Sequence, residues 1–136
     1  MVKRSLWAGL FAMSVAASGF ASGPQTVGQT ESGLVAVYAD ALHGHRTASG
    51  EVYDRTRLTA AHKTLPFGTT VRVTNTQNNK SVELRINDRG PFQKSRILDV
   101  SAAAATQLGI TRKGVRPVTL EVLALGTDTS ASASGP

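Results

Sequence analysis

Alternating apolar and polar positions dominate the middle of the chain. Two valines alternate with polar residues over 70–75, and Val82, Leu84 and Ile86 alternate with polar residues after a short polar stretch. A period of two turns one row of side chains toward a core and the other toward solvent, which is typical of a half-buried β-strand. The intervening NTQNNK is rich in residues that favour turns. The pattern therefore predicts a β-hairpin.

Shorter apolar runs on both sides of the hairpin predict further strands. They cover 34–38, 97–100 and 118–122, while 58–63 suits either a short strand or a half-turn. Ser101 followed by AAAATQLG predicts a helix with serine at its N-cap and Gly109 after its last turn. Several short strands with one small helix favour a compact barrel over a doubly wound sheet, which would need many more helices.

The ends of the chain lack this periodicity. Residues 1–23 begin with two positive charges, continue with an apolar run and end in small residues, which is the pattern of a secretory signal peptide. The apolar run over 6–17 is too short and too rich in Ala and Ser to predict a membrane span, although an uncleaved anchor is the alternative. Polar residues over 24–32 predict a linker, and small polar residues over 126–136 predict a disordered tail. One folded domain over 33–125 remains, and we expect it to be exported to the periplasm or secreted.

Composition narrows the classes of function. The chain has 136 residues, a net charge of +6 and no cysteine. Without cysteine there is no disulfide, no thiolate metal site, no cysteine nucleophile and no lipid anchor on an N-terminal cysteine. The positive charge favours anionic partners, and export favours the cell envelope over nucleic acid. We expect no cofactor and no stable membrane insertion after the signal is cleaved.

The turn that follows the second hairpin strand contains charged residues that a turn alone does not need. The second hairpin strand runs into RINDRGPF, where Asp88 lies between Asn87 and Arg89 and before Gly90-Pro91. Asp often stabilises such turns, so a purely structural role is one interpretation. If the strand alternation continues past Ile86, Asp88 lies on the inward face at the rim of the barrel and Asn87 lies on the outer face. A partly desolvated carboxyl at that rim would suit acid–base chemistry.

Two further ionisable residues, Glu51 and His62, lie in turn-rich or strand-end segments. The segments HGHRTASGEVYD, LTAAHKTLPFGTTVRVTN, SVELRINDRGPF and RILDVSAAAATQLGI follow one another in the chain. In this order they resemble blocks of the rare lipoprotein A (RlpA) family of septal peptidoglycan lytic transglycosylases, and GVRPVTLEVL resembles the closing strand. The resemblance covers 33–123. It implies a mostly β fold, a six-stranded double-psi β-barrel with one short helix, which expansins share.

The resemblance also implies an activity, which is endolytic cleavage of the MurNAc–GlcNAc bond without water, leaving 1,6-anhydro-MurNAc ends. Asp88 matches the family's catalytic acid and base, and His62 and Glu51 match its accompanying site residues. One carboxyl group can serve because the substrate's own C6 hydroxyl attacks C1, whereas a hydrolase needs a second carboxylate. We expect Asp88 to protonate the glycosidic oxygen and then take the C6 hydroxyl proton. His62 would orient the acid or a sugar group, and Glu51 would tune the local charge or help to stabilise the oxocarbenium-like state.

The expected substrate is the glycan strand of peptidoglycan without its peptide stems, cleaved in cell-wall remodelling or cell separation. Tyr38, Asn87 and Arg89 are the expected substrate-binding residues, Arg89 through its planar guanidinium. A satisfied core histidine at His62 and a solvated carboxylate at Glu51 are the structural alternatives. His43-Gly44-His45 offers too few ligands to predict a metal site. A non-catalytic, expansin-like glycan-binding module is the alternative function, and an inhibitor-like envelope protein is a third.

Overall fold

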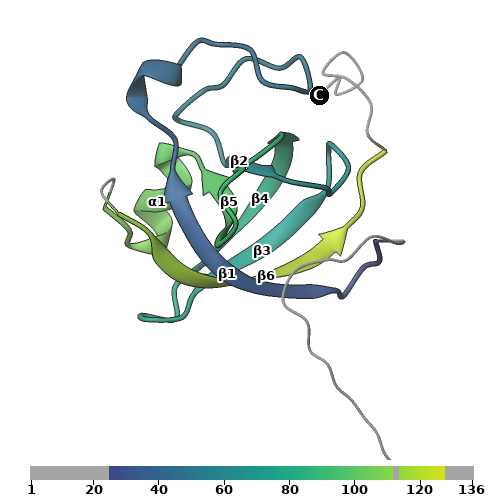
Figure 1. Ribbon diagram of the computed structural model, residues 1–136, viewed down its shortest axis with the longest axis vertical. Coiled ribbons are helices and arrows are strands. Elements are labelled where there is room, and N and C mark those ends of the chain that lie inside the picture. The colour runs from purple at the N-terminus through teal and green to yellow at the C-terminus, as the bar shows by residue number, and fades with distance from the viewer. Residues whose placement is uncertain (1–24, 112–113, 128–136) are drawn as a thin grey trace, which may run out of the picture.

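A computed structural model describes residues 25–111 and 114–127. The predicted signal peptide and most of the predicted tail lie outside these residues. Six strands close into a barrel in the order β1-β5-β2-β4-β3-β6 (Figure 1). The elements are β1 (Thr30–Val37), η1 (Asp40–Leu42), β2 (Thr59–His62), β3 (Thr70–Asn75), β4 (Ser81–Asp88), β5 (Arg96–Val100), α1 (Ala102–Leu108) and β6 (Arg116–Ala124). The pairs β1–β5 and β2–β4 are parallel and the other pairs antiparallel. The predicted six-stranded barrel with one short helix is confirmed.

The apolar rows predicted from the sequence fill the barrel. Val82, Leu84 and Ile86 of β4 are at most 5% exposed, and both valines of β3 are fully buried. Burial of each such side chain contributes roughly 1.5–3 kcal/mol. The predicted turn between β3 and β4 places Asn79 at a φ of 62°, a conformation that Asn tolerates. The hairpin therefore forms because its apolar period and its turn residues agree.

Helix α1 begins and ends where the sequence predicts. The Ser101 side chain accepts a hydrogen bond from the N–H of the third helical residue at 3.3 Å, and Gly109 adopts a left-handed φ of 71°. The Leu108 carbonyl accepts hydrogen bonds from the side-chain amides of Asn75 and Asn78, at 3.0 and 3.1 Å. These amides satisfy a helix-end carbonyl that has no partner within the helix. Within the described ranges no helix is both long enough and apolar enough to cross a membrane.

The first strand starts earlier than predicted. β1 begins at Thr30, and the Gly28 N–H already donates to the Val122 carbonyl of β6 at 2.8 Å. Residues 28–32 of the predicted linker are therefore paired with the barrel. The hydropathy pattern does not predict this early start of β1, because the buried residue at the start of its alternation is the charged Glu31, which is 8% exposed.

The other end of the barrel domain also extends by a residue. The Gly126 N–H donates to the Thr69 hydroxyl at 3.0 Å. A Cβ atom at Gly126 would lie 2.1 Å from the Phe67 carbonyl oxygen, so only glycine fits against this turn. Gly126, which was predicted to open the tail, therefore packs against the barrel domain.

The alternation of β4 breaks just before Asp88. Ala60 of β2 pairs with Ile86, whereas the next residue, Ala61, pairs with Asp88, so Asn87 is an extra residue in the strand. Ala60 and Ile86 belong to the barrel core, whereas Ala61 belongs to a separate cluster with two tyrosines. An extra residue of this kind moves the residues after it to the opposite face. The prediction that Asp88 shares the inward face with Ile86 is therefore wrong, and Asp88 lies on the outer face with Ala61.

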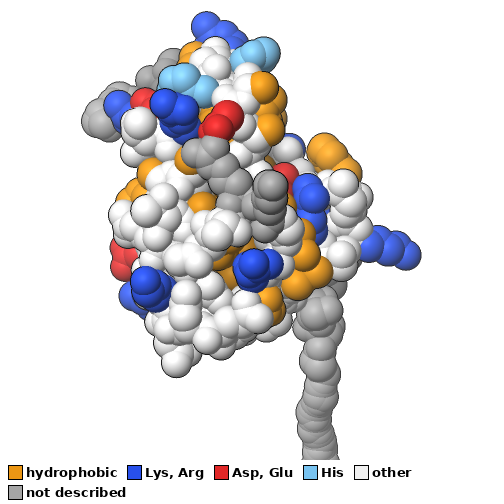
Figure 2. Space-filling model, turned by 90° about the vertical axis from the view of Figure 1, so that its left-hand side faces the viewer, with side chains coloured by type: hydrophobic (Ala, Val, Ile, Leu, Met, Phe, Trp, Pro, Cys, Tyr) orange, Lys and Arg blue, Asp and Glu red, His pale blue; other side chains and the backbone are white. Residues whose placement is uncertain are grey.

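A long connection between β1 and β2, residues 38–58, lies at one end of the barrel (Figure 1). His43 and His45 are exposed there, and Figure 2 shows histidine and basic side chains gathered at that end of the molecule. His43 Nδ1 accepts a hydrogen bond from the Arg55 N–H at 3.1 Å. In the part of the chain that the structure describes, no three His, Asp or Glu side chains are arranged to hold a metal ion.

Candidate active site

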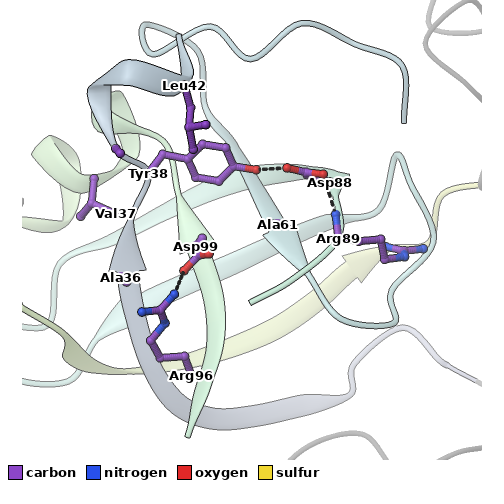
Figure 3. Close-up of a pocket in the computed structure, with 10 residues that line it drawn as sticks. Ala36, Val37, Tyr38, Leu42, Ala61, Asp88, Arg89, Arg96 and Asp99 are labelled. Atoms are coloured by element: carbon purple, nitrogen blue, oxygen red, sulfur yellow. Dashed lines mark hydrogen bonds and ion pairs between the residues drawn. The ribbon is translucent and has the colours of Figure 1, made fainter. Parts of the chain in front are cut away.

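A cleft of about 290 Å³ crosses the outer surface of β1, β5, β2 and the end of β4 (Figure 3). Ala36 pairs with Asp99, Asp99 pairs with Ala61, and Ala61 pairs with Asp88, so these four residues form one row across the strands. Two small side chains thus alternate with two carboxyl groups. The other lining residues are Val37, Tyr38, Ala39, Leu42, Arg89 and Arg96.

Three donors fix the carboxyl group of Asp88. Its Oδ2 accepts a hydrogen bond from the Tyr38 hydroxyl, and its Oδ1 accepts from the N–H groups of Ala48 and Arg89, each at 2.8 Å. Burial, together with the hydrogen bond and charge of Asp88, raises the pKa of Tyr38 far above its ordinary value. The phenol therefore keeps its proton and remains a donor to Asp88.

Tyr38 lines the cleft, as expected of a substrate-binding residue, but little of it is free. It is 9% exposed, and its ring packs against Tyr53 with 4.4 Å between the centroids. The Tyr53 hydroxyl in turn accepts a hydrogen bond from the Ala102 N–H of α1 at 3.1 Å. Tyr38 is therefore a rigid support whose hydroxyl orients Asp88.

Arg89, also expected to bind substrate, is among the residues that line the cleft. Two backbone carbonyls hold its guanidinium. Its Nη1 donates to the Leu65 carbonyl at 2.8 Å and to the His62 carbonyl at 3.3 Å. Its Cζ lies 4.1 Å from the centroid of the Phe67 ring, a cation–π contact. The side chain is thus fixed by these contacts, and Figure 3 shows that it extends away from Asp88.

His62 lies behind the cleft. It is 2% exposed and is not among the residues that line the cleft. Its Nε2 lies 2.8 Å from Glu31 Oε1, and its Nδ1 accepts hydrogen bonds from the N–H groups of Thr64 and Leu65, each at 3.1 Å. Both ring nitrogens form hydrogen bonds within the protein, as in a buried core histidine whose hydrogen bonds are all satisfied.

Glu51 and Asn87 contact each other rather than the cleft. Glu51 Oε1 accepts hydrogen bonds from Asn87 Nδ2 at 2.9 Å and from the Arg85 guanidinium. Burial raises the pKa of Glu51, but the hydrogen bonds from Arg85 and Asn87 outweigh it and hold the pKa below its ordinary value. Glu51 is therefore a paired carboxylate and not a solvated one, and Asn87, at 2% exposure, has little surface for a substrate.

The contacts of Glu51 nevertheless bear on Asp88. The Glu51 carbonyl accepts a hydrogen bond from the Thr47 N–H at 2.7 Å and closes a tight turn over 47–51. That turn carries the Ala48 N–H that binds Asp88. Glu51 thus acts on Asp88 through the backbone it anchors.

Asp99 is the cleft residue that sequence reasoning missed. Burial raises its pKa, and the negative charge of Asp88 adds to the increase, while Arg96, 3.3 Å from Asp99 Oδ1, opposes it. Two carboxyl groups therefore lie in one electrostatic environment. The sequence feature that could have indicated it is an acidic residue between the apolar Leu98 and Val100 of a short strand.

A comparison with known protein families assigns this domain. Residues 30–120 match the lytic transglycolase family. The chain belongs to this family. The resemblance to RlpA and the double-psi β-barrel that it implies are thereby confirmed for the lytic transglycolase domain.

Relatives of this lytic transglycolase domain bear the name endolytic peptidoglycan transglycosylase RlpA. The protein of Campylobacter jejuni is 47% identical over 104 residues, which are 76% of this chain and 38% of the relative. That of Vibrio cholerae is 49% identical over 102 residues, 75% of this chain and 39% of the relative. That of Neisseria meningitidis serogroup B is 50% identical over 97 residues, 71% of this chain and 41% of the relative. The chain thus spans less than half the length of these relatives.

Solved structures share the fold of this lytic transglycolase domain at lower identity. A Streptomyces papain inhibitor superposes with a TM-score of 0.55 and 22% identity, covering 71% of this chain and 96% of the inhibitor. An expansin of Clavibacter michiganensis gives a TM-score of 0.56 and 19% identity, covering 70% of this chain and 50% of the expansin. A variant of that expansin was solved in complex with cellohexaose.

Proposed function

We propose that the cleft is the active site of an endolytic peptidoglycan transglycosylase, which breaks the MurNAc–GlcNAc bond and leaves a 1,6-anhydro-MurNAc end. The observation that carries the proposal is the row in which Asp88 and Asp99 flank Ala61 in one cleft. Glycoside cleavage needs a carboxyl group that can give and take a proton beside the bond. The RlpA relatives are named for this activity.

Asp88 and Asp99 lie on two strands separated by β2, so their Cα atoms are roughly 9–10 Å apart at ordinary strand spacing. A hydrolase with a carboxylate nucleophile uses two carboxyl groups, one as acid and one to attack C1. In the proposed reaction the C6 hydroxyl of MurNAc attacks C1 instead, so Asp99 is not needed as a nucleophile.

In the proposed reaction the protonated carboxyl of Asp88 gives its proton to the glycosidic oxygen as the C1–O bond breaks. The C6 hydroxyl then bonds to C1, and the carboxylate of Asp88 takes the hydroxyl proton, which restores the acid. Burial raises the pKa of Asp99, so this second carboxyl group of the cleft keeps a proton to higher pH than an ordinary aspartate. No water is consumed.

The other predicted site residues contribute by placement in this proposal. Tyr38 and the Ala48 N–H orient the two oxygens of Asp88. Glu51 and Asn87 secure the turn that carries Ala48. Such fixation matters because a displacement of about 1 Å can cost on the order of 10²-fold in rate.

The proposed substrate also fits an exported protein. The cleft floor carries Ala36 and Ala61, whose small side chains leave room for a sugar ring. Peptidoglycan lies outside the cytoplasmic membrane, so the proposed activity requires the export that residues 1–23 predict. We propose peptide-free glycan strands as the substrate, with the periplasm or the exterior as the place of action.

Mass spectrometry of digested glycan strands tests the function. Purified protein is incubated with peptide-free strands, and we expect anhydro-ended fragments that disappear with Asp88→Asn. Asp54→Asn is the control, because Asp54 is an exposed carboxylate on a loop that does not line the cleft. Fragments that have gained water would instead identify a hydrolase. Binding of strands without any fragments would support the expansin-like alternative, and competition by cellohexaose would strengthen it.

A further inference from the structure

Two ionisable side chains meet inside the barrel although their strands are not neighbours. Glu31 of β1 pairs in register with Leu120 of β6, and His62 of β2 pairs with Leu98 of β5. Both leucines are fully buried in the core, and residues paired in register present their side chains to the same face. Glu31 and His62 therefore both point inward, where they meet with 2.8 Å between Oε1 and Nε2.

The hydrogen bonds of His62 define its tautomer. A backbone N–H can only donate, so Nδ1, which receives the N–H groups of Thr64 and Leu65, carries no hydrogen. The ring hydrogen is therefore on Nε2, which donates to the Glu31 carboxylate. The ring is thus committed on both sides, and it has no nitrogen to offer a sugar.

The turn that His62 holds reaches the cleft. Its Nδ1 ties the turn over 62–65, and that turn presents the carbonyls of His62 and Leu65 to Arg89. The Arg89 N–H in turn donates to Asp88 Oδ1. A continuous series of contacts thus runs from Glu31, inside the barrel, to the carboxyl group in the cleft.

We propose that Glu31 and His62 are a positioning pair, which fixes the side chain of Arg89, the residue whose backbone N–H binds Asp88, and takes no part in proton transfer. Glu31 accepts the Nε2 hydrogen and holds the ring angle, and the ring holds the turn. The pair's effect on catalysis rests on the proposed function, whereas its effect on Arg89 does not. Inside the closed barrel Glu31 has lost its hydration, and the hydrogen bond from Nε2 of His62 compensates for part of that cost.

Paired substitutions separate positioning from chemistry. Glu31→Gln retains an acceptor for Nε2, so it should keep kcat within about threefold, whereas Glu31→Ala should lower kcat on the order of 10²-fold. The side-chain oxygen in His62→Asn replaces Nδ1 as acceptor for the turn, whereas His62→Gln keeps only the contact with Glu31. We expect His62→Asn to retain more activity than His62→Gln, and the pH–rate profile of His62→Asn to keep the wild-type shape.

A readout without substrate tests the same pair. The Arg89 side-chain Nε–H resonance, assigned by its loss in Arg89→Lys, should shift in Glu31→Ala and His62→Gln and return toward wild type in Glu31→Gln. The ¹⁵N shifts of His62 at neutral pH should show a protonated Nε2. Asn75→Ala is the control, because Asn75 is equally buried and bonded to Leu108 but lies at the far end of β3.

The outcomes distinguish the two proposals. If the wild type yields no anhydro product, the proposed function fails, while the Arg89 resonance still decides the positioning pair. The pair is refuted if His62→Asn and Glu31→Gln lose all activity while the Arg89 resonance stays unchanged. It is also refuted if Asn75→Ala moves that resonance as much as Glu31→Ala, since general loosening would then explain the effect.

Discussion

The Tyr38 hydroxyl donates a hydrogen bond to the same carboxyl group, Asp88, whose other oxygen is held by two backbone N–H groups. Tyr38 ends up beside Asp88 because β1 and β4 flank the β5–β2 pair in the barrel. The phenol therefore sets the direction of one carboxyl oxygen in the cleft.

Removal of the Tyr38 hydroxyl should lower activity without disturbing the fold. A hydrogen bond to a charged group contributes about 1.5–3 kcal/mol, so Tyr38→Phe is expected to lower kcat about 10- to 100-fold if that bond orients Asp88 in the transition state. Tyr53→Phe is the matched control: it loses a hydrogen bond to Ala102 of α1 and should cost about 1 kcal/mol of stability, with kcat within twofold. Equal kcat losses in the two variants would contradict the orienting role.

Asp99→Asn should change both the pH dependence of activity and that of stability. The folded pKa of Asp99 is raised by burial, so the folded state binds its proton more tightly than the unfolded state. Stability from this group is present below its ordinary pKa of 3.8 and is lost as pH rises through the folded pKa. Asp99→Asn should therefore raise Tm at neutral pH and not below pH 3.8.

The same substitution tests the carboxyl pair in catalysis. Without Asp99 the cleft loses the carboxyl group whose pKa burial raises, and the alkaline fall of kcat should begin at lower pH than in the wild type. A pH–rate profile with peptide-free strands measures this. A profile identical to that of the wild type would remove Asp99 from the proposed reaction.

Glu51→Gln should change the pH dependence of stability in the opposite direction to Asp99→Asn. The folded pKa of Glu51 is lowered, so its contribution to stability is present above its ordinary pKa of 4.5 and is lost as pH falls through the folded pKa. The variant should lose a few degrees of Tm at neutral pH, a modest effect because Arg85 is 40% exposed and its interaction is screened. The difference in Tm should shrink below pH 4.5, and thermal melts across that range would show it.

Gly126→Ala should destabilise the barrel. The added methyl group would lie 2.1 Å from the Phe67 carbonyl oxygen and 2.5 Å from neighbouring backbone atoms, which cannot move aside as a side chain can. A cost of about 1–3 kcal/mol is expected from such overpacking. Leu125→Ala, at a residue 39% exposed, should stay within about 1 kcal/mol in the same denaturant titration.

The regular parts of the fold follow from local pattern. The β3–β4 hairpin and α1 have apolar periods, turn residues and caps that agree with one another, so their position could be predicted. The start of β1 could not, because Glu31 is a charged residue in a buried position and its compensation by His62 is a long-range contact. A hydropathy pattern contains no information on such a partner.

The candidate site divides in the same way. The sequence predicts a partly buried Asp88 at the rim of the barrel, and the structure places Tyr38, Asp88 and Arg89 in one cleft. It could not show that the nitrogens of His62 and the amide of Asn87 are used by other protein groups, since polar residue types look alike whether they bind substrate or backbone. Asp99 could not be predicted because it reaches the cleft through the strand order, which places Ala61 between Asp99 and Asp88. Residues close to Asp99 in the chain do not show this.

The extra residue at Asn87 makes the cleft sensitive to chain length as well as to residue identity. If β4 paired with β2 without this irregularity, Ala61 would pair with Asn87, and Asp88 would turn inward in line with Ile86. An insertion or deletion near the end of β4 would therefore change how Asp88 is presented, even where every side chain in the cleft is retained.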